Sequence, residues 1–157
     1  MKTVSKDQNN IGGIARIWLI PNSIISALPS SQVVGQYIMP VEWGRDAWEL
    51  FPIFQSASLA IKNLRTSAGS YWESTISFSL PKFDLTNESY VYEFNNHLWC
   101  LLLLDQNGQW ILVGDANFPM RLDVDTKTGS DISDLNNLQF TFVNKSPFRP
   151  LFVDKPF

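Results

Sequence analysis

The 157-residue sequence predicts one mainly β domain with a single helix, and three observations carry this prediction. Apolar residues make up 45 % of the chain, aromatic residues 13 % and charged residues only 17 %, a composition typical of a folded, β-rich protein. The stretch LWCLLLLDQNGQWILVG, residues 98–114, has the pattern of a β-hairpin. Four of the nine prolines fall between residues 21 and 55 and exclude long regular elements there.

The N-terminal third is predicted to contain one strand followed by extended segments. Residues 1–10 are polar and read as a loose arm. A strand is expected over Ala15–Ile20, opened by Gly12-Gly13 and ended by Pro21. Residues 21–55 favour short strands or extended loops, although Arg45–Leu50 would also fit one helical turn.

A second hairpin is predicted over 56–65 and 71–80, with its turn at Ser67–Ser70. Residues 56–65 would also satisfy a helix, so the first of these strands has an open alternative. The alternation in the second strand puts one set of side chains on a common face: Trp72, Ser74, Ile76, Phe78 and Leu80.

The helix is predicted over 86–97, immediately before the 98–114 hairpin. Thr86 is a suitable N-cap, and His97 lies late, where the helix dipole favours it. The next strand, Leu98–Leu104, is continuously apolar, so both of its faces should be covered, one of them by this helix or by another subunit. Asn107-Gly108 is expected to supply two residues of positive φ to a tight turn.

The C-terminal part is predicted to hold two more strands and an irregular tail. The strands are expected at 119–124 and 138–143, separated by a polar loop over 125–137. Residues 144–157 contain three prolines and four large apolar groups. We expect this tail to form no regular structure and to pack against something, with a neighbouring subunit as a candidate.

Charge and cysteine content narrow the class of protein. The formal net charge of −3 argues against a protein that grips nucleic-acid phosphates. The single cysteine, Cys100, lies in the apolar hairpin strand and is interpreted as a buried small hydrophobe. The polar N-terminus has no signal-peptide core, and no apolar run approaches the ~20 residues that span a bilayer. We expect a soluble protein made in the cytoplasm, without membrane insertion.

No motif in the sequence predicts catalysis or a cofactor. Asp123–Asp134 has carboxylates at short spacing, as calcium loops do, but Lys127 occupies a ligand position and no Glu closes the loop. A solvated loop is therefore the favoured interpretation, in which Asp131 caps a turn. His97 is the only histidine, and a structural place at the helix end is favoured over a catalytic role.

Tryptophan content leaves a carbohydrate-binding interpretation open. Aromatic platforms stack on sugars, but most of these indoles have strand-like apolar neighbours, where core or interface is favoured. The six tryptophans are Trp18, Trp43, Trp48, Trp72, Trp99 and Trp110.

The C-terminal half resembles a small family of virion proteins from phages and prophages of Bacteroidetes (crAss-like). An apolar strand precedes Asp-x-Asn-Gly, an aromatic residue and Gly-x-x-x-x-Pro follow, and then come a Thr-Gly loop and a Phe-rich last strand. The opening Gly12-Gly13-Ile14 and RIWL over 16–19 are also similar to the start of such chains. The residues that carry the pattern are Asp105, Asn107, Gly108, Trp110, Gly114, Pro119, Thr128, Gly129, Phe140 and Phe142.

The resemblance implies a structural protein of the phage tail or neck, similar to tail tube and tail-completion subunits. It implies an antiparallel β-sandwich or small barrel with one flanking α-helix (about 86–97) and extended terminal arms, and it brings no catalytic residues. The expected partners are further copies in a ring or tube, other tail or neck proteins, and DNA that passes without specific binding. The residues expected at these contacts are Ile11, Gly12, Gly13, Trp18, Phe148, Phe152 and Phe157, with turn or loop positions Asn107, Gly108, Asp131 and Asp134.

Two other classes of protein remain open at this point. A carbohydrate- or receptor-binding module of a tail appendage predicts solvent-accessible tryptophans and glycan binding. A small hydrolase predicts a cleft with paired glutamates. The sequence favours neither over assembly.

Overall fold

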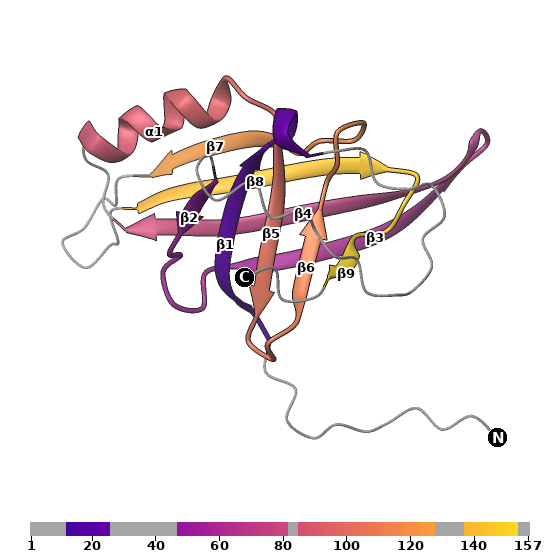
Figure 1. Ribbon diagram of the computed structural model, residues 1–157, viewed down its shortest axis with the longest axis horizontal. Coiled ribbons are helices and arrows are strands. Elements are labelled where there is room, and N and C mark those ends of the chain that lie inside the picture. The colour runs from indigo at the N-terminus through magenta and orange to yellow at the C-terminus, as the bar shows by residue number, and fades with distance from the viewer. Residues whose placement is uncertain (1–11, 26–46, 82–84, 128–136, 154–157) are drawn as a thin grey trace.

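The computed structural model describes residues 12–25, 47–81, 85–127 and 137–153, and these form a β-sandwich with one helix. Both sheets are antiparallel, and Figure 1 shows the strands of one sheet crossing those of the other. Sheet A has the strand order β2 (Trp48–Leu50), β1 (Ile14–Pro21), β5 (Trp99–Asp105), β6 (Trp110–Val113) and β9 (Leu151–Val153). Sheet B has the order β3 (Ser58–Thr66), β4 (Gly69–Pro81), β8 (Asn137–Ser146) and β7 (Arg121–Lys127). The predicted fold class is confirmed.

The hairpin predicted at 98–114 forms as β5 and β6, but its turn differs from the prediction. Gly108 has φ +80°, whereas Asn107 is not in the positive-φ region. Asp105 N–H donates to Gln109 O at 3.0 Å, and Gly108 N–H donates back to Asp105 O at 3.2 Å. The loop therefore holds three residues with one left-handed glycine, the longer hairpin class that follows the two-residue turn in frequency.

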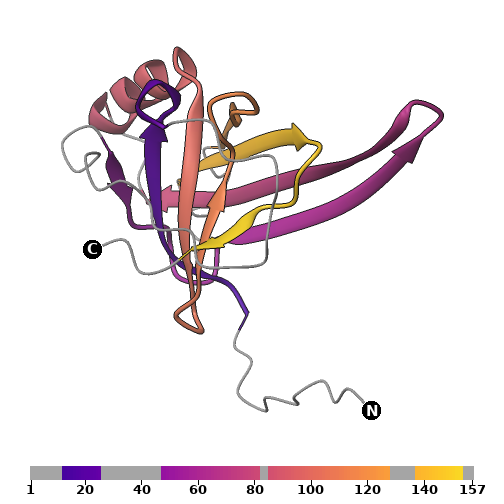
Figure 2. The same cartoon turned by 45° about the vertical axis from the view of Figure 1, so that its right-hand side comes forward.

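The second predicted hairpin is also present, as β3 and β4, and the helical alternative for its first strand is wrong. β3 pairs with β4 along its full length, from Ser58 opposite Ser77 to Thr66 opposite Gly69. In β4 the expected face points inward, with Ile76 and Phe78 buried. Figure 2 shows the far end of this hairpin reaching well beyond the body of the sandwich.

The main core lies between the sheets and is rich in aromatic rings. Phe78 stacks on Phe140 with ring centroids 5.3 Å apart and on Phe142 at 6.1 Å, and all three rings are buried. Leu101 and Leu103 of β5 belong to the same cluster. β4 and β8 alternate between buried residues that face this core and more exposed residues on the outer face, as strands of a one-sided sheet do.

Sheet A is buried on its outer face as well, which confirms the prediction that β5 is covered on both sides. Cys100 and Leu102 point away from the inter-sheet core into a second apolar cluster and are fully buried. Trp18 belongs to this outer cluster, and its ring lies 5.0 Å from that of Trp110.

The single helix, α1, spans Leu85–Asn95 and ends two residues before the predicted boundary. Because it begins at Leu85, Thr86 lies within its first turn and is not the N-cap. Phe94 is fully buried and contacts Trp99 at 5.5 Å and Phe140 at 6.3 Å, both edge to face. The helix thus reaches β5 only at its first residue and packs at one end of the sandwich, while the rest of the inner face of β5 faces sheet B (Figure 1). Sheet B, and not the predicted helix or another subunit, therefore covers most of this face.

The N-terminal region is close to the prediction. The strand expected at Ala15–Ile20 is β1, one residue longer at each end, and a short 3₁₀ turn, η1, follows at Asn22–Ile24. Trp48–Leu50 pairs with β1, so the helical turn considered for 45–50 is wrong over these residues and the short strand is right. The residues before 12 and those from 26 to 46 lie outside the described part of the chain.

The prediction for the C-terminal tail is wrong over the described residues. β8 continues to Ser146, and after Pro147 the chain crosses to sheet A, where β9 pairs with β6. Prolines at 147 and 150 flank the crossing and leave the three residues of β9 free to donate to the ladder, as an edge strand permits. Val153 is buried against the outer face of the same chain, so this part of the tail packs on its own domain.

Candidate functional site

The predicted contact residues that the structure describes do not form one patch. Trp18 is 6 % exposed and packs within the outer cluster of sheet A. Gly12 and Gly13 are exposed, and Gly13 O accepts a hydrogen bond from Gln106 N at 3.2 Å. This bond joins the start of β1 to the Asn107-Gly108 turn. Four further predicted residues lie outside the described part of the chain: Ile11, Asp131, Asp134 and Phe157.

The two predicted tail residues, Phe148 and Phe152, have different surroundings. Phe148 is half-buried, and its ring lies 6.4 Å from that of Phe118. Phe152 sits on the edge strand β9 and is 57 % exposed. Phe152 is thus the predicted tail residue with the larger apolar surface open to a partner.

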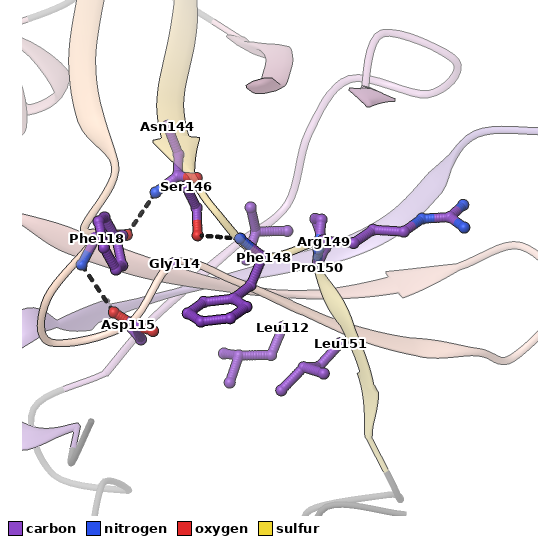
Figure 3. Close-up of a pocket in the computed structure, with 11 residues that line it drawn as sticks. Leu112, Gly114, Asp115, Phe118, Asn144, Ser146, Phe148, Arg149, Pro150 and Leu151 are labelled. Carbon is purple, nitrogen blue, oxygen red and sulfur yellow. Dashed lines mark hydrogen bonds between the residues drawn. The ribbon is translucent and has the colours of Figure 1, made fainter. Parts of the chain in front are cut away.

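A buried polar cluster, shown in Figure 3, joins the 114–119 loop to the end of β8. Asp115 Oδ1 accepts hydrogen bonds from Asn117 N at 2.8 Å and Phe118 N at 2.7 Å. Asn144 Nδ2 donates to Phe118 O and to Pro119 O. Because these polar groups are buried, each such bond avoids a desolvation cost, and together they fix the loop on the sheet.

The cavity beside this cluster is too small for an organic ligand. It holds about 20 Å³, the space of roughly one water molecule. Ser146 Oγ, at the same place, accepts from Phe148 N at 3.0 Å and so orients the start of the crossing to β9. The cluster is therefore a structural clasp for the crossing from β8 to β9.

An exposed aromatic corner, formed by Phe51 and Phe54, follows β2 at residues that the sequence did not indicate as a site. Phe51 is 63 % and Phe54 80 % exposed. Ser56 N–H donates to Ile53 O at 3.0 Å and closes a turn in which Gln55 has φ +62°, a position that glycine or asparagine usually fills. The pattern Phe-Pro-Ile-Phe was its only signal, since a proline inside an apolar run keeps the run out of a strand.

This corner is held firmly on the sandwich. Ile53 N–H donates to Ser79 O at 2.8 Å, and Ser56 Oγ donates to Ile53 O at 2.7 Å while accepting from Ser79 N at 3.2 Å. The Arg16 guanidinium lies 6.0 Å from the centre of the Phe51 ring. Phe54 thus lies exposed on a hydrogen-bonded turn, and the same hydrogen bonds hold Gln55 in its costly backbone conformation.

A larger cleft, of about 520 Å³, opens at the end of the sandwich where α1 meets β1 and β2. Its walls combine two indoles with a carboxylate, an imidazole and a hydroxyl group. The residues that line it are Pro21, Ser23, Ile24, Ala47, Trp48, Glu93, His97 and Trp99.

Nucleophilic and metal chemistry find little support in the described residues. Burial, aided by the nearby Asp115 carboxylate, raises the pKa of the Cys100 thiol to about 12, so it stays protonated at neutral pH. This confirms the interpretation of Cys100 as a buried small residue. Within the described ranges, no group of three or more His, Cys, Asp or Glu side chains is placed to hold a metal ion.

No family model, curated protein or solved structure matches the chain. Among the described residues, no helix is both long and apolar enough to cross a membrane.

Proposed function

We propose that this chain is a structural subunit of a phage virion that assembles with copies of itself into a ring or tube, in the tail or at the head-tail junction. The resemblance of its C-terminal half to phage virion proteins gives the biological setting. The two edges of sheet A supply the physical argument.

Among the described strands, the edges of sheet A are β2 and β9, and each edge carries exposed phenylalanine. Phe51 follows β2, with Phe54 three residues later, and Phe152 lies on β9. An edge strand offers unpaired backbone groups, and large exposed aromatic side chains are enriched at protein interfaces. Two apolar edges on opposite sides of one sheet are the observation that carries the proposal.

The directions of the two edge strands indicate how one copy of the chain would meet the next. β2 and β5 both run antiparallel to β1, and β9 runs antiparallel to β6, which is itself antiparallel to β5. β2 and β9 therefore point the same way. A contact between β9 of one copy and β2 of the next is head to tail, and such contacts build closed rings when the rotation between copies closes.

Charge supports passage of DNA through such a ring without adhesion. The chain carries a formal net charge of −3, and nonspecific affinity for DNA arises from clustered Lys and Arg that release counterions from phosphates. The protein should therefore not be retained on duplex DNA at physiological salt.

Light scattering across a concentration series, with negative-stain images of the same fractions, tests the proposal. Phe152→Asp places a charge at the β9 edge, and Phe54→Ser removes the ring beyond β2; each should shift the particle mass towards the monomer. Tyr92→Ser is the matched control, because Tyr92 is 71 % exposed but lies on α1. A wild-type protein that stays monomeric at every concentration, or assemblies that both edge variants leave intact, would contradict the proposal.

A further inference from the structure

We infer that the cleft lined by Trp48, Glu93 and His97 binds a neutral sugar ring, with the ring face on the Trp48 indole and its hydroxyl groups on the two polar side chains. The inference does not depend on self-assembly, because the cleft lies at the end of the sandwich where α1 packs and is built within one chain.

The cleft is large enough for a small-molecule ligand. At about 520 Å³ the cleft falls within the range of about 300–1,000 Å³ typical of small-molecule sites. A pyranose or a disaccharide has room there. The clasp cavity beside Asp115, at about 20 Å³, does not admit such a ligand.

The aromatic wall is held in place before any ligand arrives. The Trp48 ring meets Tyr90 at 5.5 Å and Phe94 at 5.6 Å, both edge to face, and Phe94 is fully buried. Trp48 itself is half-buried, so part of its indole remains accessible. An indole fixed in this way loses little side-chain entropy on binding, and its electron-rich face attracts the polarised C–H bonds of a sugar.

The polar groups come from separate elements and complement one another. The Glu93 carboxylate oxygens can accept hydrogen bonds from two neighbouring hydroxyl groups of a ligand. A neutral His97 ring has one nitrogen that donates and one that accepts, and Ser23 adds a hydroxyl group from η1. Across the described residues, neither the Glu93 carboxylate nor the His97 nitrogens take part in a hydrogen bond or ion pair, and the His97 ring rests on Trp99 at 5.9 Å.

This set of groups favours a neutral polyol over other ligands. An anion would be repelled by Glu93, and a purely apolar molecule would desolvate that carboxylate without replacing its hydrogen bonds. An organic cation would pair with Glu93 and the indole but would leave the imidazole and the hydroxyl unused. A sugar ring uses the apolar wall and all three polar groups.

Binding is tested by nuclear magnetic resonance on the folded, full-length chain, with methyl glycosides of glucose, galactose, mannose and N-acetylglucosamine as probes. The indole N–H signals are followed during titration, and the Trp48 signal is assigned by its loss in Trp48→Phe. We expect at least one glycoside to shift the Trp48 signal to saturation. Glu93→Gln and His97→Ala should each weaken that binding about tenfold.

Two controls check that the binding is specific to the cleft and to a neutral sugar. Glu49→Gln changes a carboxylate next to Trp48 that pairs with Arg16 at 3.3 Å outside the cleft, and it should leave the affinity unchanged. Choline is the cationic probe. The inference is overturned if no glycoside moves the Trp48 signal, if the Glu93 and His97 variants bind as tightly as wild type, or if choline binds and the glycosides do not.

Discussion

Cys100 shows how burial makes a thiol unreactive, so that the side chain contributes only to packing. Its thiol lies on the outer face of sheet A with no exposed surface, and Sγ is 3.8 Å from Asn22 Oδ1. The thiolate would lose its hydration there without gaining a cation, so the pKa rises to about 12 from 9.0. A nucleophilic role would need the opposite shift.

This shift predicts a loss of stability at alkaline pH. Between about pH 9 and 12 the unfolded chain releases the Cys100 proton while the folded chain keeps it, so the free energy of unfolding falls as pH rises, by at most about 1.4 kcal/mol per pH unit. Urea unfolding of wild type and Cys100→Ala at several pH values, under reducing conditions, isolates the effect from other titrating groups. A wild-type-minus-variant difference that stays constant from pH 8 to 11 would rule it out.

At the scale of elements, the β5–β6 hairpin depends on one carboxylate at its turn. Asp105 Oδ1 accepts hydrogen bonds from Asn107 N at 2.8 Å and Gln109 N at 2.7 Å. Asp105→Ala leaves both N–H groups to water and should lower the free energy of unfolding by about 1–2 kcal/mol, the range of a lost helix cap. Asp105→Asn keeps an acceptor oxygen and should lose less. Urea denaturation of both variants beside wild type measures the losses, and an Asp105→Ala variant as stable as wild type would show that these bonds contribute nothing.

The same hairpin shows which features of the fold the local sequence can predict. Asn107-Gly108 between apolar runs was enough to place both strands and the turn. This pattern did not predict the turn type, because the Asp105 carboxylate accepts hydrogen bonds from two backbone N–H groups of the turn. The result is a three-residue loop in which only Gly108 has positive φ. Local patterns predicted the pairing correctly, whereas a side-chain hydrogen bond decided the geometry.

Long-range contacts account for the larger errors among the elements. The tail looked irregular because its prolines interrupt any long pattern, yet Leu151–Val153 needs only three residues to pair with β6. Its partner lies about forty residues earlier in the chain, and the clasp at Asn144 that directs it there is not a sequence motif. The position of α1 also depends on long-range contacts, because Phe94 packs against rings from β2, β5 and β8.

For the whole molecule, the sequence predicted the class of fold but not the surfaces that could serve a function. Alternation in β4 and the continuous apolar run of β5 distinguish a one-sided sheet from a two-sided one, and the structure has both. The Trp48 cleft was not predictable, because its groups come from η1, β2, α1 and the start of β5 and meet only in the folded sandwich. Trp18, expected at a contact, is instead packed beside Trp110.

Assembly through the edges of sheet A predicts that stability depends on protein concentration. Copies that bind the folded state and not the unfolded one stabilise it by mass action, so the thermal midpoint should rise with each tenfold increase in concentration. A monomer has no such dependence. Scanning calorimetry of wild type over a hundredfold range should show the rise, and Phe152→Asp should flatten it while Tyr92→Ser keeps it. If the midpoint of wild type does not move, the exposed phenylalanines at the two edges do not join copies of this chain under those conditions, and the ring loses its physical basis.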